Sequence, residues 1–399
     1  MNVYVRELGC QLGQLGLPVD IFTRRTNSET PERLALCPNV NVIAIAAGPP
    51  QPLAKNDLFP YLPEFAAEMA LYSLREGIRY DVMHAHYWLS GWAAHLARRY
   101  WDAPFVQMFH TTAHMKNAVA AVADRESMLR GQIERRLLDL ADSVIAANPD
   151  ERADLVWRQG TANAKVCTIP PGVDLDLFRP RDRDDARKQL DLPPDQPILL
   201  FVGRIDPIKG IDTLLAASER LRDHPALTSP PLILFVGGDL DAAGEPEGPL
   251  AAVVAEADAR GVADRFRFVG SQPQDQLPLF YSAADLVVVP SRYESFGLVA
   301  IEAMACGTPV VASRVGGLTF TIDEGGSGLL VPPNDPEALA EAVALLLLDS
   351  GCRRALASGA LTTAERFAWP SVAASIMHVY QRLADGHRAN LCCEEDLYA

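Results

Sequence analysis

The sequence lacks any apolar run close to the roughly 18 residues that a membrane-spanning helix needs, and it opens without a signal-peptide pattern. Basic residues are also in deficit, with 36 Lys and Arg against 51 Asp and Glu and a net charge of −15. Because phosphate backbones and anionic membranes select basic surfaces, we expect no nucleic-acid partner and no membrane span. Any phosphate binding must therefore come from a local cluster of cations.

The seven cysteines are odd in number and form no C-x-x-C pair. This spacing predicts reduced thiols rather than a disulfide framework or a zinc site, and with it a cytoplasmic location. The adjacent pair Cys392 and Cys393 falls in a C-terminal stretch without a pattern, where a bystander role is favoured over a redox role.

With 399 residues, the chain is long enough for two domains. Strand-like and helical patterns alternate along it, which predicts parallel sheets covered by helices on both faces. Strands are expected in the first half at residues 18–25, 39–48, 81–88, 104–112, 143–148 and 165–172. In the second half they are expected at 197–206, 231–239, 265–271, 285–291, 309–317 and 328–333, with helices following Pro336.

The opening residues 1–16 have the pattern of an amphipathic helix ending at a glycine. A Rossmann-like unit normally begins with a strand and a glycine-rich turn, and only then a helix. Two interpretations stay open. Either the natural N-terminus lies upstream of Met1, or the strand has been lost and leaves a sheet edge unpaired.

Residues 285–313 form the first candidate site. An apolar run ends at Pro290, and a helix is predicted from about residue 298 until Gly307 stops it. Ligands of open α/β sheets bind beyond the carboxyl ends of the strands, where N–H groups at a helix start can hold a phosphate. Glu294 lies in that loop and Glu302 about two turns into the helix, although such carboxylates are also common at helix edges.

Residues 202–215, VGRIDPIKGIDTLL, form the second candidate. Arg204 and Lys209 follow a predicted strand and precede a helix, a setting in which two cations and backbone N–H groups suit a diphosphate. Taken alone, the two residues could equally be a surface pair. The next strand ends in the glycines of FVGG (235–238), which allow close backbone approach.

Histidines concentrate in HAHYW (84–88) and HTTAHMKN (110–117). Imidazoles are common metal ligands, so His84, His86, His110 and His114 could form a metal site. No carboxylate lies at ligand spacing near them, which favours hydrogen-bonding roles instead.

These motifs resemble those of retaining, two-domain (GT-B) glycosyltransferases of family 4. PSRYESFGLVAIEAMACGTPVVAS (290–313) resembles the E-x7-E signature, and Arg204 with Lys209 matches the R-x4-K pair. The histidine segments are similar to H-x-H-Y-W and H-T-x-x-x-x-K-N of the subgroup with D-inositol-3-phosphate glycosyltransferase, sucrose-phosphate synthase and sucrose synthase. The resemblance extends from Met1 to about Leu383.

The resemblance implies site residues of three kinds. The catalytic residues would be His110, Arg204, Lys209 and Glu294. Donor-binding residues would be Gly203, Gly237, Ser295, Phe296, Gly297, Leu298, Val299 and Glu302. The acceptor would be bound by Lys55, Tyr87, Thr111 and Arg130. Cations and backbone N–H groups would stabilise the donor diphosphate, so no metal ligand and no tightly bound cofactor is expected.

The implied fold is α/β of the GT-B type, with two Rossmann-like domains whose parallel sheets face a deep interdomain cleft. The expected divisions are an acceptor-side N-terminal domain without its first strand and Gly-rich turn (1–177), a charged, solvated linker (178–196), a C-terminal nucleotide-sugar-binding domain (197–370), a helix returning towards the N-terminal domain (371–386) and a frayed tail (387–399).

The implied activity is that of a retaining hexosyltransferase, with a nucleotide diphosphate sugar such as UDP-GlcNAc or UDP-glucose as donor substrate. The acceptor would be a small hydroxylated molecule with or without a phosphate, such as inositol phosphate. Sucrose-phosphate synthase-like glucosyl transfer to a sugar phosphate, and a non-catalytic nucleotide-sugar-binding relative, stay open as alternatives. An NAD-dependent oxidoreductase is disfavoured, because no G-x-G-x-x-G follows a predicted strand. The expected partners are small molecules, with a homodimer left open.

Overall fold

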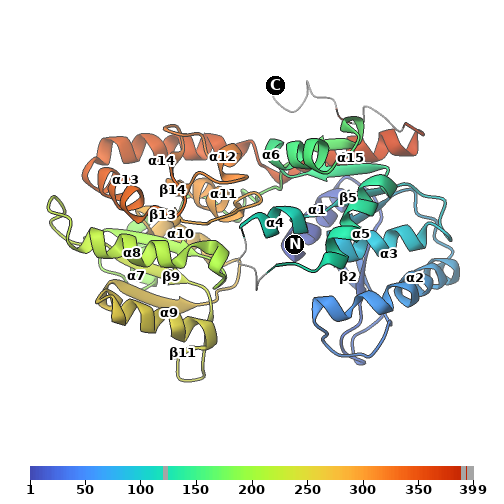
Figure 1. Cartoon of the computed structure of the whole chain (residues 1–399), viewed down its shortest axis with the longest axis horizontal. Coiled ribbons are helices and arrows are strands. Elements are labelled where there is room, and N and C mark those ends of the chain that lie inside the picture. The colour runs from blue at the N-terminus through green and yellow to red at the C-terminus, as the bar shows by residue number, and fades with distance from the viewer. Residues whose placement is uncertain (120–124, 388–391, 393–399) are drawn as a thin grey trace. The chain divides into compact units, whose positions relative to one another are not determined.

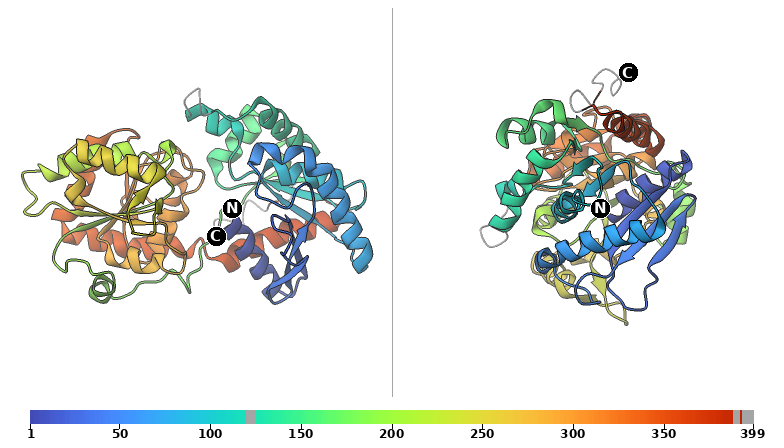
Figure 2. Two further views of the ribbon diagram at one scale, coloured as in Figure 1. Left: turned by 90° about the horizontal axis from the view of Figure 1, so that it is seen from below. Right: turned by 90° about the vertical axis from the view of Figure 1, so that its right-hand side faces the viewer.

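The computed structural model describes residues 1–119, 125–387 and 392. The chain divides into two compact units, in each of which helices surround a parallel β-structure (Figures 1 and 2). The first unit comprises Met1–Gly172 and the C-terminal segment from Trp369, and the second comprises Val173–Ala368. Of the predicted tail, only His387 and Cys392 lie within the described residues.

The first unit contains a three-stranded and a four-stranded sheet. The three-stranded sheet has the order β1 (Val19–Arg24), β3 (Val40–Ile45) and β2 (Arg33–Cys37), and the four-stranded sheet has the order β4 (Met83–His86), β5 (Phe105–Met108), β6 (Ser143–Ala146) and β7 (Val166–Thr168). All neighbours pair in parallel except β2, which runs antiparallel to β3. In the described residues β1 and β4 each have one neighbouring strand.

Strand β2 is the one strand of this unit that the sequence analysis did not predict. Four of its five residues are exposed, so it shows no buried face. The other strands were found because burial on one or both faces leaves an apolar pattern in the sequence.

The helices of the first unit pack on these sheets. They are α1 (Asn2–Gln14), α2 (Leu62–Glu76), α3 (Tyr87–Ala97), α4 (Ala113–Val119), α5 (Met128–Leu140), α6 (Pro149–Ala153) and α15 (Trp369–Ala384), with the 3-10 turn η1 (Lys55–Asp57) before α2. Helix α1 buries Tyr4, Leu8 and Leu12 and packs against α15.

The second unit contains a six-stranded sheet with the order β12-β9-β8-β13-β14-β15, and every pair is parallel. Its strands are β8 (Ile198–Val202), β9 (Leu232–Val236), β12 (Phe266–Gly270), β13 (Leu286–Val289), β14 (Val310–Ser313) and β15 (Gly328–Val331). All six were predicted. Five of them are almost wholly buried, and strands buried on both faces form continuous apolar runs, whereas β12 is only partly buried. The short antiparallel pair β10 (Asp239–Leu240) and β11 (Pro246–Glu247) was not predicted.

Helices cover both faces of this sheet (Figure 2). They are α7 (Arg183–Gln189), α8 (Ile211–Arg222), α9 (Gly248–Ala259), α10 (Leu277–Ala283), α11 (Leu298–Ala305), α12 (Leu318–Thr321), α13 (Pro336–Leu348) and α14 (Ser350–Glu365). The chain runs outward from β8 through β9 to β12 and then returns to the other side of β8 as β13. The strand order therefore reverses between β8 and β13, which is where open α/β sheets bind ligands.

Most residues of the stretch 178–196 are exposed, as its charge predicts, but not all of them. The stretch contains α7, and Arg187 is only 2% exposed. The Arg187 guanidinium pairs with Asp285 at 2.8 Å and donates to the carbonyl oxygens of Ala283 and Pro194. A charged residue whose donors are all directed at acceptors can be buried, and a composition argument does not detect this.

The prediction of reduced thiols is wrong for four of the seven cysteines. Cys10 of α1 is bonded to Cys37 of β2, and Cys167 of β7 is bonded to Cys392. Cys306 and Cys352 are free, and Cys393 lies outside the described residues. The partners are 27 and 225 residues apart, so only the tertiary fold brings them together. The thiol argument for a cytoplasmic location therefore no longer holds. In the described part of the chain, no helix is long and apolar enough to cross a membrane.

Candidate active site

The loops after β8 and β13 bring Lys209 and Glu294 together at the point where the strand order reverses. Lys209 ends the 3-10 turn η6 (Pro207–Lys209), and its Nζ lies 2.6 Å from Oε2 of Glu294. Ser291 Oγ lies 3.4 Å from the same carboxylate oxygen. Both charged side chains are less than one-fifth exposed, so the pair is partly shielded from water.

Arg292 fixes these two loops to each other, a role that the sequence analysis missed. Its backbone N–H donates to Ile208 O at 2.7 Å, and its guanidinium donates to Pro207 O at 2.6 Å and to Asp212 at 2.5 Å. The same loops approach so closely at Gly210 that a Cβ there would lie 1.9 Å from Pro290 O. The sequence feature that could have drawn attention to Arg292 is its position as a cation two residues before Glu294.

Helix α11 begins at Leu298, four residues after Glu294. Gly297 has φ +90°, and no side chain of the described residues caps the helix start. The first N–H groups of a helix have no carbonyl partner within it, so those of Leu298 and Val299 can bind an anion. Phe296 itself is 3% exposed and packs edge-on against Phe367, which makes it an anchor of this loop.

Glu302 lies in the second turn of α11 and accepts a hydrogen bond from Tyr281 OH at 2.7 Å. Burial raises the pKa of the Glu302 carboxyl to about 7, and the hydrogen bond from Tyr281 opposes this only in part. When the Glu302 carboxyl is ionised, both of its oxygens can accept hydrogen bonds from hydroxyl groups.

Arg204 is not part of the Lys209–Glu294 pair. Its side chain is 82% exposed, and it lies 3.9 Å from the Asp206 carboxylate. The preceding Gly203 lies close to Gly237 of the next loop, where a Cβ would be 1.9 Å from Gly203 O. The predicted glycines therefore permit two strand ends to approach, while the cation extends into solvent.

In the first unit, His110 and Tyr87 follow β5 and β4 and have positive φ angles of 61° and 77°. Such backbone strain in residues other than glycine is typical of functional sites. His110 Nε2 lies 3.1 Å from His86 Nδ1, and Tyr380 OH lies 2.6 Å from His84 Nδ1. Burial lowers the pKa of His110 to about 3, so its imidazole is neutral at ordinary pH.

The alternative metal site is not assembled. Within residues 1–119, 125–387 and 392, no group of three or more His, Cys, Asp or Glu side chains could hold a metal ion. His114 instead pairs with Asp154 at 3.1 Å, away from the His84–His86–His110 stack.

The four predicted acceptor-binding residues lie together. Arg130 is buried, with its guanidinium carbon 4.7 Å from the centre of the Tyr87 ring, and its Nη2 donates to Thr111 O at 2.5 Å. Lys55 Nζ lies 2.9 Å from Glu126, the carboxylate that Arg130 also binds, at 3.0 Å. Four segments that are separated in the sequence therefore meet around Arg130 and Glu126.

Sequence reasoning missed three further members of this cluster. Lys116 Nζ lies 2.8 Å from Glu126 Oε1, and Glu134 pairs with Arg130 at 2.6 Å. Lys116 belongs to the HTTAHMKN segment and could have been singled out there. Glu126 and Glu134 gave no signal, because Glu side chains are mostly exposed to solvent.

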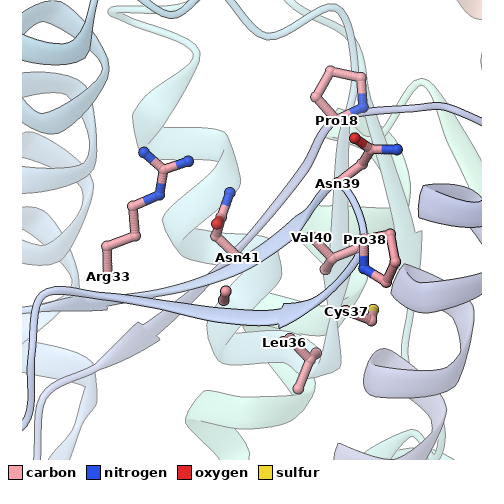
Figure 3. A pocket seen from close by; sticks show the side chains of 9 residues that line it. Pro18, Arg33, Leu36, Cys37, Pro38, Asn39, Val40 and Asn41 are labelled. Carbon is pink, nitrogen blue, oxygen red and sulfur yellow. The ribbon is translucent and has the colours of Figure 1, made fainter.

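A separate surface hollow of about 630 Å³ lies beside the turn between β2 and β3 (Figure 3). Pro18, Arg33 and Asn41 are among the residues that line it, and none of the predicted site residues does. Much of its lining, including Pro18 and Asn39, lies at the amino ends of β1 and β3. Ligands of parallel sheets gather at the carboxyl ends, so we do not assign this hollow to the active site.

Comparison with known proteins gives two family matches. Residues 1–177 match the model described as Glycosyltransferase Family 4, and residues 182–362 match Glycosyl transferases group 1. The chain is 41% identical to a D-inositol 3-phosphate glycosyltransferase of Streptosporangium roseum, over 98% of this chain and 89% of the relative. A second such enzyme, from Catenulispora acidiphila, is 43% identical over 98% of this chain and 91% of its own length.

Among solved structures, sucrose-phosphate synthase from Thermosynechococcus elongatus superposes with a TM-score of 0.86 at 38% identity, covering 97% of this chain and 94% of that chain.

Proposed function

The chain belongs to glycosyltransferase family 4 and has the GT-B fold, and from this premise we propose that it is a retaining hexosyltransferase. Its donor is a nucleotide diphosphate sugar, UDP-GlcNAc or UDP-glucose. Its acceptor is a small hydroxylated molecule that carries a phosphate, of the inositol phosphate type. The observation that carries the proposal is the convergence of Lys209, Glu294 and the start of α11 where the strand order reverses.

The second unit supplies the donor-binding groups. Lys209, Arg204 and the N–H groups of Leu298 and Val299 stabilise the charge that builds on the departing diphosphate. Glu294 accepts hydrogen bonds from hydroxyls of the sugar, and Glu302 from those of the ribose. Gly203 and Gly237 let the backbone approach the donor, while Ser295, Phe296 and Gly297 shape the turn between Glu294 and α11.

The first unit supplies the acceptor-binding groups. Lys55, Arg130, Tyr87 and Thr111 bind the acceptor phosphate, with cationic and hydroxyl donors suited to its three oxygens. The similarity to D-inositol 3-phosphate glycosyltransferases supports an inositol phosphate. The similarity to sucrose-phosphate synthase favours a second candidate, transfer to a sugar phosphate. A panel of phosphorylated acceptors separates the two.

The proposed chemistry needs no protein nucleophile. The acceptor hydroxyl attacks on the face that the diphosphate leaves, and a donor phosphate oxygen helps to take its proton. His110 is neutral, because burial lowers its pKa to about 3, and it donates a hydrogen bond to a donor-sugar hydroxyl at the reacting centre.

The donor assignment is tested by a thermal-shift titration with UDP, GDP and ADP. A ligand that binds the folded state raises the unfolding midpoint by mass action. We expect one nucleotide to stabilise the wild type and Lys188→Ala, but not Lys209→Ala. Lys188 is a matched control, because its side chain is 77% exposed and pairs with Asp185 on α7.

In turnover assays Lys209→Ala should be slower by a factor of about 10², as is usual for loss of a preorganised charge partner. An equal midpoint shift in Lys209→Ala and wild type would contradict the donor site. Nucleotide binding without turnover on any acceptor would instead favour a non-catalytic relative.

A further inference from the structure

One carboxylate oxygen lies at the centre of three cations in the first unit. Glu126 Oε1 is 2.9 Å from Lys55 Nζ, 2.8 Å from Lys116 Nζ and 3.0 Å from Arg130 Nη1. The three cations come from η1, α4 and α5, so only the fold brings them together. The Glu126 side chain is 5% exposed, and we call this group of four residues the Glu126 cluster.

The positive charge of the Glu126 cluster exceeds what Glu126 neutralises. Arg130 has a second partner, because its Nε is bound to Glu134 and its Nη2 donates to Thr111 O. Lys55 and Lys116 both direct their ammonium groups at Glu126. A phosphate monoester carries up to two negative charges and three acceptor oxygens, so it matches three converging cations better than one carboxylate does.

We propose that the Glu126 carboxylate is a built-in occupant of the acceptor phosphate site, which a phosphate monoester must displace. Glu126 thereby lowers the affinity for phosphorylated acceptors, because their phosphate must first displace its carboxylate. This inference rests on the proposed function for the location of the acceptor. A neutral hydroxyl group cannot replace a carboxylate among three cations, whereas a phosphate dianion can.

The backbone around Glu126 allows its side chain to leave while the helix stays formed. The N–H of Glu126 donates to Asn117 Oδ1 at 2.7 Å, and the neighbouring Ser127 caps α5 by accepting from Arg130 N at 3.2 Å. Rotation about the Glu126 side-chain bonds therefore suffices to clear the site. The cations remain positioned by their own elements and are ready for an incoming anion.

Protonation does not release Glu126 under ordinary conditions. Burial opposes ionisation, but hydrogen bonds from Lys116 and Lys55 and the charge of Arg130 outweigh it and hold the pKa of Glu126 at about 2. The carboxylate therefore competes with phosphate at every pH at which the enzyme can be assayed.

The test is calorimetric titration of inorganic phosphate at pH 8 and constant ionic strength into wild type, Glu126→Gln and Glu32→Gln. The amide keeps the shape of the side chain and removes its charge. We expect Glu126→Gln to bind phosphate at least tenfold more tightly than wild type. Glu32→Gln changes the net charge equally, but Glu32 pairs with Arg75 on the exposed surface, so it should bind as wild type does.

Whether Glu126→Gln binds phosphate more tightly or more weakly than wild type decides between two roles for Glu126, a competitor of phosphate and a support that holds the three cations in place. If Glu126 serves only to hold the three cations in place, Glu126→Gln will bind phosphate no more tightly than wild type, or more weakly, and the inference is overturned. Absence of phosphate binding in every variant overturns it as well. Glu126→Asp covers the case in which Glu126→Gln does not fold. It keeps the negative charge on a side chain that is one methylene shorter. Its affinity for phosphate should lie between those of wild type and Glu126→Gln.

Kinetics separates this inference from the proposed function. In Glu126→Gln the KM for a phosphorylated acceptor should fall, while the KM for the same acceptor without phosphate stays unchanged. Failure of UDP, GDP and ADP to bind would remove the proposed donor reaction and leave the phosphate result standing. Normal nucleotide binding with unchanged phosphate affinity would remove only the role of Glu126.

Discussion

Glu302 combines its proposed binding role with a cost in stability. Its pKa is raised by burial to about 7, above the ordinary value of 4.5, so the folded protein binds an extra proton between these values. The stability that this proton contributes is present below pH 4.5 and is lost as the pH rises through 7. The ionised carboxylate that would bind a ribose is thus the form that the free protein tolerates least.

We therefore predict that Glu302→Gln stabilises the free protein increasingly as the pH rises. The difference from wild type should grow from near zero at pH 4.5 to about 3 kcal/mol at pH 8, at about 1.4 kcal/mol per unit of pKa shift. Denaturant midpoints across this pH range measure it. Glu256→Gln is the control, because Glu256 is 50% exposed and pairs with Arg260 on α9. UDP should bind more weakly to Glu302→Gln than to wild type. A stability difference between Glu302→Gln and wild type that does not change with pH would contradict the raised pKa of Glu302.

At the level of single residues, the sequence predicted those in fixed motifs. Lys209, Glu294 and Glu302 were singled out, because their spacing from a strand end is local information, and their roles stay predictions. Arg292 and Glu126 were not, because they act through contacts with segments 80 and 71 positions away in the chain. No local pattern records such contacts.

The start of α11 depends on one glycine. Gly297 adopts φ +90°, and a Cβ there would lie 2.6 Å from Leu318 Cδ2. A side chain would therefore meet both backbone strain and a collision, and either would move the N–H groups of Leu298 and Val299. The proposed anion site is therefore formed by the backbone of α11 rather than by any single side chain.

Gly297→Ala should accordingly weaken nucleotide diphosphate binding at least tenfold. Gly244→Ala is a matched control in the same unit, because Gly244 has φ +84° but nothing within 4 Å of its Cβ position. It incurs the conformational cost without the collision, and its nucleotide affinity should equal that of wild type. Calorimetric titration with UDP measures both, and equal losses in the two variants would show that α11 geometry is not what binds the diphosphate.

At the scale of the whole molecule, the two disulfides among the described residues constrain the chain over very different distances. Cys10–Cys37 closes a short loop, whereas Cys167–Cys392 joins residues 225 positions apart. In the chain-entropy treatment a loop of that length corresponds to about 5 kcal/mol of stabilisation. The Cys167–Cys392 bond therefore ties the end of the chain to β7 of the first unit.

Thiol titration in denaturant should give four more thiols after reduction than before. Reduction should also lower the unfolding midpoint, and Cys10→Ser and Cys167→Ser should each remove two of the four additional thiols. Equal thiol counts with and without reductant would contradict both bonds. Cys352→Ser is the control, because Cys352 is free and its loss changes both counts equally.

The sequence by itself determined the positions of the six parallel strands in the second unit, since apolar runs and helix-stop signals are local. It also determined the family, because the motifs around Arg204, Lys209, Glu294 and His110 have fixed spacing. The tertiary structure alone decided which cysteines pair, that Arg187 is buried against Asp285, and that Lys55, Lys116 and Arg130 converge on Glu126. These features depend on which distant segments the packed sheets and helices bring within a few ångströms of each other, and hydrophobic periodicity along the chain contains no record of that.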